Sequence, residues 1–115
     1  ALRETREELG IATDEIEILG ELSPLFIAPS QNLVHPLVGW TEQLPPLVPS
    51  PAEVAEVLVV PLRRLLAPET RDDFDYRRAD QLLTAPCYRV PGGCIWGATA
   101  MMLSELLTLV ATLIA

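Results

Sequence analysis

The feature that constrains this chain most is a cluster of three glutamates near its beginning, within Arg3–Ile11. Glu4 and Glu7 are three residues apart and Glu4 and Glu8 four apart, so a helix would place all three carboxylates on one side. Like charges at this spacing destabilise a helix unless something offsets them. A bound divalent cation would do so, and a cluster of oxygen ligands favours Mg²⁺ or Mn²⁺ over Zn²⁺. A solvated acidic helix surface is the alternative.

The residues around the glutamates predict where this helix ends. Glycine adopts the left-handed conformation readily, so Gly10 is expected to end the helix and Ile11 to turn back onto the core. Arg3 lies beside Glu4 and is expected to orient its carboxylate through a charge-assisted hydrogen bond. The sequence therefore predicts a short acidic helix with an abrupt end.

The same stretch resembles the second half of the Nudix box, G-x5-E-x7-R-E-U-x-E-E-x-G-U, in which U is a bulky apolar residue. Thr5 stands where an aliphatic residue is more usual, and the matching positions are Arg3, Glu4, Glu7, Glu8, Gly10 and Ile11. The leading glycine and first glutamate of the box would precede Ala1. We therefore expect residues 1–115 to be the C-terminal part of a single Nudix hydrolase domain that starts inside the box.

Later segments resemble the coenzyme A pyrophosphatase branch of that family. They occur in the same order as in the branch, and they are residues 24–30, 34–40, 53–57, 60–62, 88–90 and 95–100. The coenzyme A signature of the branch lies upstream of the Nudix box, so the substrate assignment depends on these secondary segments. A nucleoside diphosphate derivative such as ADP-ribose or NADH is an alternative substrate. A Nudix-like module that binds without catalysis is an alternative function.

The resemblance implies an α/β fold, an α/β/α sandwich with a mixed sheet that would be incomplete at the N-terminus. It implies hydrolysis of the pyrophosphate of coenzyme A or acyl-coenzyme A to 3′,5′-ADP and a 4′-phosphopantetheine product. Mg²⁺ or Mn²⁺ held by Glu4, Glu7 and Glu8 would neutralise the pyrophosphate charge. Glu4 and Glu53 are the candidates for the carboxylate that accepts a proton, Glu56 is a less favoured candidate with a structural role as its alternative, and Arg3 would support the site.

Composition limits the class of protein and its partners. The chain has 115 residues, half of them hydrophobic, which suits one small domain with a packed core. A net charge of −8 argues against a nucleic-acid backbone or an anionic membrane as the main partner. Cys87 and Cys94 fit no metal-ligand spacing, and reduced thiols are expected in a cytoplasmic protein. A homodimer is left open.

Hydrophobic patterning gives a provisional order of elements. It predicts strands over residues 15–22, 33–40 and 53–62 and a short helix at 63–66. Residues 67–85 are polar and charged, and we expect a surface loop with a short helical piece near 78–83. Within that loop, Arg77 and Arg78 are expected to be solvated, with contact to a substrate phosphate the less favoured alternative. The tryptophans Trp40 and Trp96 are expected in the core.

The last 22 residues, Cys94–Ala115, contain a single charge, Glu105. A helix of this length and apolarity could span a membrane. Its polar residues share one arc of the helical wheel, and no Lys or Arg flanks it, which favours a helix packed against a sheet. Membrane association through this helix is kept as a third hypothesis.

Overall fold

The computed structural model describes residues 1–114 and shows an α/β chain of helices and three small sheets. Every strand pair among these residues is antiparallel. The chain divides into two compact units. The first combines Ala1–Leu22 with His35–Leu58, and the second combines Ser23–Val34 with Val59–Ala115.

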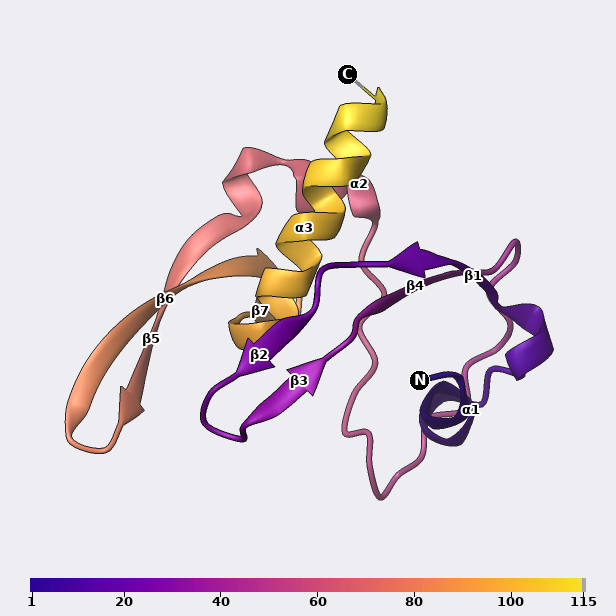
Figure 1. The fold of residues 1–115 in the computed structure, drawn as a ribbon, viewed down its shortest axis with the longest axis horizontal. Coiled ribbons are helices and arrows are strands. Elements are labelled where there is room, and N and C mark those ends of the chain that lie inside the picture. The colour runs from indigo at the N-terminus through magenta and orange to yellow at the C-terminus, as the bar shows by residue number, and fades with distance from the viewer. Residues whose placement is uncertain (115) are drawn as a thin grey trace. The chain divides into compact units, whose positions relative to one another are not determined.

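The first unit contains a helix, a short 3-10 turn and a two-stranded sheet. Its elements are α1 (Leu2–Leu9), η1 (Thr13–Glu15), β1 (Glu17–Glu21) and β4 (Leu37–Trp40). β1 pairs with β4, and the register shifts between Ile18 and Gly20 (Figure 1). The strand expected over residues 15–22 is therefore present, although its side chains are exposed rather than half-buried.

The second unit contains two further sheets and the C-terminal helix (Figure 1). Its elements are β2 (Leu25–Ile27), β3 (Asn32–Val34), α2 (Leu62–Leu66), η2 (Pro68–Thr70), β5 (Arg71–Arg78), β6 (Gln81–Val90), β7 (Gly93–Ile95) and α3 (Gly97–Ile114). β2 and β3 form a hairpin, and the other sheet has the order β5-β6-β7. The short helix expected at residues 63–66 and the C-terminal helix are both confirmed.

The core of the second unit lies where α2, β6 and α3 meet. Its buried members are Leu65, Tyr88, Val90, Ala100 and Leu107. Glu105, the single charge of the C-terminal stretch, accepts two hydrogen bonds from the Ser23 backbone N–H, at 2.7 and 3.0 Å. The helix is thereby tied to the segment that leads into β2.

The expectation of one continuous strand over residues 33–40 is wrong. The strand is interrupted at His35 and Pro36, and β3 and β4 lie on either side. Proline has no N–H to donate to a ladder, so a continuous pairing would fail at this position. The Pro36 carbonyl instead accepts a hydrogen bond from Leu22 N–H at 2.9 Å.

The strand expected over residues 53–62 is also wrong, because residues 53–61 form no strand and Leu62 begins α2. The backbone N–H groups of Glu53 and Val54 both donate to the Ser50 carbonyl, at 3.1 and 2.8 Å. These bonds close a turn and use the donors that a ladder would need.

The surface loop expected over residues 67–85, with its helical piece, is wrong as well. β5 and β6 form a long hairpin there, which Figure 1 shows as the two longest strands. Phe74 and Tyr76 alternate with aspartates, which is the period of two that a strand requires. The hairpin turns at Ala79, whose φ is 55°.

Trp40 and Trp96 are not core residues, because their exposed fractions are 55% and 40%. α3 has 18 residues, a mean hydropathy of 1.7 and only 11% of its residues buried, so by length and composition it is able to cross a membrane.

Candidate functional site

α1 presents two different faces. Leu2 and Thr5 line an apolar cavity of about 250 Å³ within the first unit, together with Ile16, Ile18 and Trp40. Glu4, Glu7 and Glu8 are all exposed and, by helical periodicity, lie on the opposite side of the helix. The expected arrangement of three carboxylates on one exposed face is present.

Arg3 lies between two of these carboxylates. Its guanidinium is 3.6 Å from Glu4 Oε1 through Nη2 and 3.8 Å from Glu7 Oε1 through Nε. Arg3 thus forms an ion pair with Glu4, and the charge-assisted hydrogen bond expected between them is not formed, because 3.6 Å is too long for one.

The helix ends as the sequence indicates. Gly10 is left-handed, with φ 74°, and its N–H donates to the Arg6 carbonyl at 2.9 Å. Ile11 is buried. Both expectations about this helix end are confirmed.

A segment from later in the first unit binds this helix end. Val48 N–H donates to the Leu9 carbonyl and Ser50 N–H donates to the Glu8 carbonyl, both at 2.8 Å. These carbonyls are among the groups that an α-helix leaves without an internal partner at its C-terminus. A Cβ at Gly10 would lie 2.9 Å from Val48 Cβ, so glycine is required for contact as well as for its φ.

Glu53 follows this docked segment directly. Its N–H bonds to Ser50, whose own N–H bonds to Glu8, so two backbone bonds connect the turn of Glu53 to α1. Glu53 is exposed. The expectation that Glu53 lies at the start of a strand is wrong. The sequence also gave no indication that Val48 and Ser50 contact the end of α1. The only signal for a stiff segment here was its proline content.

The carboxylates suit a divalent cation in chemical type. All three donors are oxygens on one exposed helix face, as a hard cation requires. The side chains of Glu4 and Glu7 turn toward Arg3, and within residues 1–114 no three Asp, Glu, His or Cys side chains converge on one point. Binding of a divalent cation would therefore require the exposed side chains of Glu4 and Glu7 to change rotamer.

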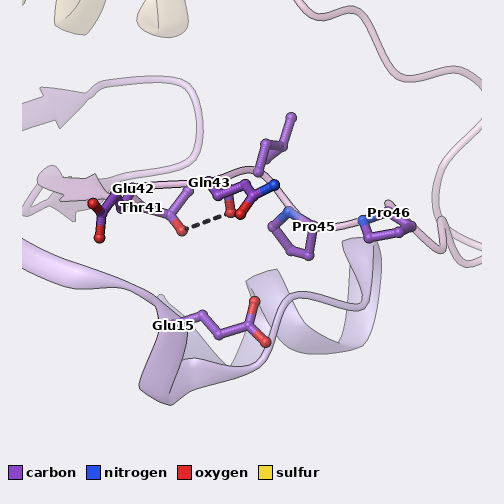
Figure 2. Close-up of a pocket in the computed structure, with 7 residues that line it drawn as sticks. Glu15, Thr41, Glu42, Gln43, Pro45 and Pro46 are labelled. Carbon is purple, nitrogen blue, oxygen red and sulfur yellow. Dashed lines mark hydrogen bonds between the residues drawn. The ribbon is translucent and has the colours of Figure 1, made fainter.

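A separate open cavity of about 450 Å³ lies in the same unit (Figure 2). It is lined by Glu15 and by the consecutive residues Thr41 to Pro46. Thr41 Oγ1 donates to the Gln43 carbonyl at 3.3 Å, and the Glu15 and Glu42 side chains are the charged groups of its wall. None of the expected site residues lines it.

No family model matches the chain. Individual relatives do: the chain is 37% identical over 109 residues to an uncharacterized Nudix hydrolase of Photorhabdus laumondii, covering 92% of this chain and 56% of that protein. The chain is a homologue of the Nudix hydrolases. It is also 35% identical over 114 residues to a human mitochondrial coenzyme A diphosphatase, with 96% of this chain and 48% of that protein covered.

A third relative is a mouse peroxisomal coenzyme A diphosphatase, 36% identical over 69 residues, with 60% of this chain and 29% of that protein covered. The chain thus spans about half the length of the first two relatives. The resemblance to Nudix hydrolases, which the residues of the acidic helix indicated, is confirmed.

Proposed function

We propose that the protein is a metal-dependent pyrophosphohydrolase. The observation that carries the proposal is the α1 helix, where three exposed carboxylates share one face and Gly10 closes the helix end. Homology to Nudix hydrolases supports the reaction class. We also propose that the whole protein adopts the α/β/α sandwich with a mixed sheet.

The residues of the proposed site have separate roles in metal binding, orientation and proton transfer. Glu4, Glu7 and Glu8 would hold Mg²⁺ or Mn²⁺, which when bound supplies positive charge against the pyrophosphate. Arg3 is proposed to orient Glu4 and Glu7 beside the ion after these side chains have changed rotamer, since it lies within ion-pair distance of both. Glu4 or Glu53 accepts the proton of the attacking water, and the docked turn keeps Glu53 in the vicinity of the helix end.

The proposed substrate is coenzyme A or acyl-coenzyme A, cleaved to 3′,5′-ADP and 4′-phosphopantetheine or its acyl form. Two relatives named as coenzyme A diphosphatases support this choice. We propose a cytoplasmic location on the basis of the two free thiols, Cys87 and Cys94.

The test is hydrolysis of coenzyme A by the purified full-length protein, with product separation by chromatography. We expect 3′,5′-ADP to appear with Mg²⁺ or Mn²⁺ and to disappear with a chelator. ADP-ribose and NADH are assayed in parallel, and faster cleavage of either would replace the coenzyme A assignment. Cleavage that persists in chelator would contradict the metal-dependent mechanism.

The identity of the proton acceptor is tested by three variants and a control. If Glu53 is the base, Glu53→Gln lowers kcat strongly at saturating metal, and metal affinity measured by calorimetry is unchanged. Glu4→Gln lowers both, because Glu4 is also a proposed ligand. Glu17→Gln is the control, an exposed carboxylate on β1 of the same unit. Unchanged kcat in both Glu53→Gln and Glu56→Gln would leave Glu4 as the base.

A second candidate is membrane association through α3, favoured by the small buried fraction of this apolar helix. The full-length protein would then sediment with neutral phosphatidylcholine vesicles. Leu109→Ser and Leu113→Ser, at two exposed positions of α3, would abolish sedimentation. Absence of the wild-type protein from the vesicle pellet would dismiss this candidate.

A further inference from the structure

The outer edge of β5 is a surface that the proposed chemistry does not use. β5 is an end strand of the sheet β5-β6-β7, and among residues 1–114 the strand that pairs with it is β6 alone (Figure 1). A strand with one neighbour presents the N–H and C=O groups of its other side to any chain able to pair with them. With 8 residues, β5 is longer than the short edge strands by which proteins avoid such pairing.

The position of Pro86 indicates which backbone groups of β5 turn outward. Pro86 lies opposite Asp73 and has no N–H, so this pair is of the kind that exchanges no ladder hydrogen bonds. The Asp73 N–H donates instead to Asp72 Oδ1 at 2.8 Å. Pairs with and without hydrogen bonds alternate along an antiparallel ladder, so the odd-numbered residues of β5 turn their backbone groups outward.

Two charges of opposite sign lie along this edge without partners in the described part of the chain. Asp72 is bonded to Arg89 on β6, whereas Asp73 and Arg77 take part in none of the salt bridges of residues 1–114. Both side chains are exposed, and strand alternation places them on one face of the sheet. Charges of a single sign would keep another copy of the strand away, whereas charges of both signs allow it to pair.

The outward groups limit how two copies of β5 can pair. Odd-numbered residues turn outward in both copies, so they must lie opposite odd-numbered residues. An antiparallel ladder centred on Phe74 would place Asp73 opposite Asp75, with like charges in contact. A ladder centred on Tyr76 would be shorter and would leave Asp73 opposite the turn of the hairpin. A ladder centred on Asp75 places Asp73 of each copy opposite Arg77 of the other.

The register centred on Asp75 also brings aromatic side chains together. Phe74 of each copy lies opposite Tyr76 of the other, and cross-strand aromatic pairs stabilise a sheet. Within one copy these two rings are already stacked, and the Trp96 ring lies 4.9 Å from each of them, measured between centroids. The unfavourable contact is that of Asp75 with its equivalent at the centre, where each carboxylate accepts a hydrogen bond from Thr84 at 2.8 Å.

We propose that β5 is a dimerisation edge, which pairs antiparallel with β5 of a second copy of this chain in the register centred on Asp75. Asp73 and Arg77 form two ion pairs across the contact, and the Asp73 N–H exchanges its bond to Asp72 for one to the second copy. This interaction goes beyond the proposed hydrolase function and does not depend on it. One added pair of strands is a small interface, so we expect a dissociation constant of about 10 µM or weaker.

Sedimentation velocity of the full-length protein tests the dimer directly. We expect the wild type to pass from monomer to dimer as its concentration rises from about 1 to about 300 µM at low salt. The ion pairs are exposed, so the Kd should rise several-fold between about 50 and about 500 mM NaCl. A wild-type protein that stays monomeric over the whole concentration range would overturn the proposal.

An exchange of charges tests which residues meet. Asp73→Arg would oppose two pairs of arginines in the dimer and Arg77→Asp two pairs of aspartates, so each should raise the Kd at least about tenfold. An equimolar mixture of the two variants restores both attractive contacts, and we expect a heterodimer with a Kd close to that of the wild type. A misfolded variant could not restore the dimer, so the mixture also controls for folding.

Two further variants complete the test. Arg63→Asp on α2 makes the same change of charge as Arg77→Asp at another exposed position and should leave the Kd unchanged. Asp75→Asn removes the like-charge contact at the centre and should lower the Kd, whereas in the register centred on Tyr76 it would remove an ion pair and raise it. A raised Kd in Asp75→Asn, or a mixture of the charge variants that dimerises no better than each alone, would overturn the proposal.

Discussion

Two stretches of this chain carry three carboxylates each, and they place them differently. In α1 the glutamates fall on one exposed face, and Arg3 is the side chain that pairs with two of them. In β5 the aspartates Asp72, Asp73 and Asp75 fall on a strand. Asp72 binds Arg89 with an Nε–Oδ2 distance of 2.6 Å, and Asp75 accepts a hydrogen bond from Thr84 at 2.8 Å.

The difference follows from the period of each element. A helix brings residues three and four apart onto one side, so negative charge accumulates there. A strand sends successive side chains to opposite faces, and Asp72 and Asp75 each meet a different residue of β6, Arg89 and Thr84. Similar acidic composition therefore gives a surface able to attract a cation in α1 and two aspartates with separate partners in β5.

The largest expected effect separates these two stretches by activity. Glu7→Gln and Glu8→Gln each remove one proposed ligand, and we expect kcat/KM for coenzyme A to fall by at least about 100-fold at fixed metal concentration. Asp73→Asn on β5 is the matched control, and its kcat/KM should equal that of the wild type. Near-normal kcat/KM in both glutamate variants at saturating metal would show that the two stretches do not differ as argued.

The second effect concerns the glycine that ends α1. Gly10→Ala forces a Cβ into a left-handed position and against Val48, so we expect a loss of about 1–3 kcal/mol in the free energy of unfolding. Gly20→Ala in β1 is the control, because a Cβ at that position would meet nothing within 4 Å and its φ is not left-handed. Urea denaturation measures both. Equal stabilities would mean that the helix end adapts freely.

The same two stretches show what the sequence can predict. α1 was predicted with its end because the evidence is local: charge spacing, Gly10 and the apolar Ile11. The hairpin of β5 and β6 was missed because its charged residues concealed the alternation of Phe74 and Tyr76. Strand formation there depends on partners that lie elsewhere in the chain, including Arg89 for Asp72.

The candidate site was predictable only in part for the same reason. Its acidic face follows from residue spacing on a single helix, which needs no tertiary information. The backbone bonds of Val48 and Ser50 to the end of α1 join residues about forty positions apart, and backbone donors carry no side-chain signature. The role of Glu53 therefore stays a prediction, and the strand on which the sequence placed it is absent from the structure.

The smallest expected effect tests the paired state of β5. The hydrogen bond from Arg89, and then that from the Asp73 N–H, hold the pKa of the Asp72 carboxyl below its ordinary value of 3.8. A carboxyl whose pKa is lowered by folding stabilises the protein above its unfolded pKa, and this contribution is lost as the pH falls through the folded pKa. We therefore expect the Asp72–Arg89 pair to contribute at neutral pH and to be lost below pH 3.8.

Arg89→Gln should raise the pKa of Asp72 toward its ordinary value, as measured by NMR titration of the side-chain carboxyl carbon, because the strongest donor is removed. Arg77→Gln, on the same hairpin and in none of the salt bridges of residues 1–114, should leave that titration unchanged. Both groups of the pair are exposed, so salt should weaken the effect. An unaltered Asp72 titration in Arg89→Gln would mean that Arg89 does not lower the pKa of this aspartate, and the contrast between helix and strand would fail at its best-defined contact.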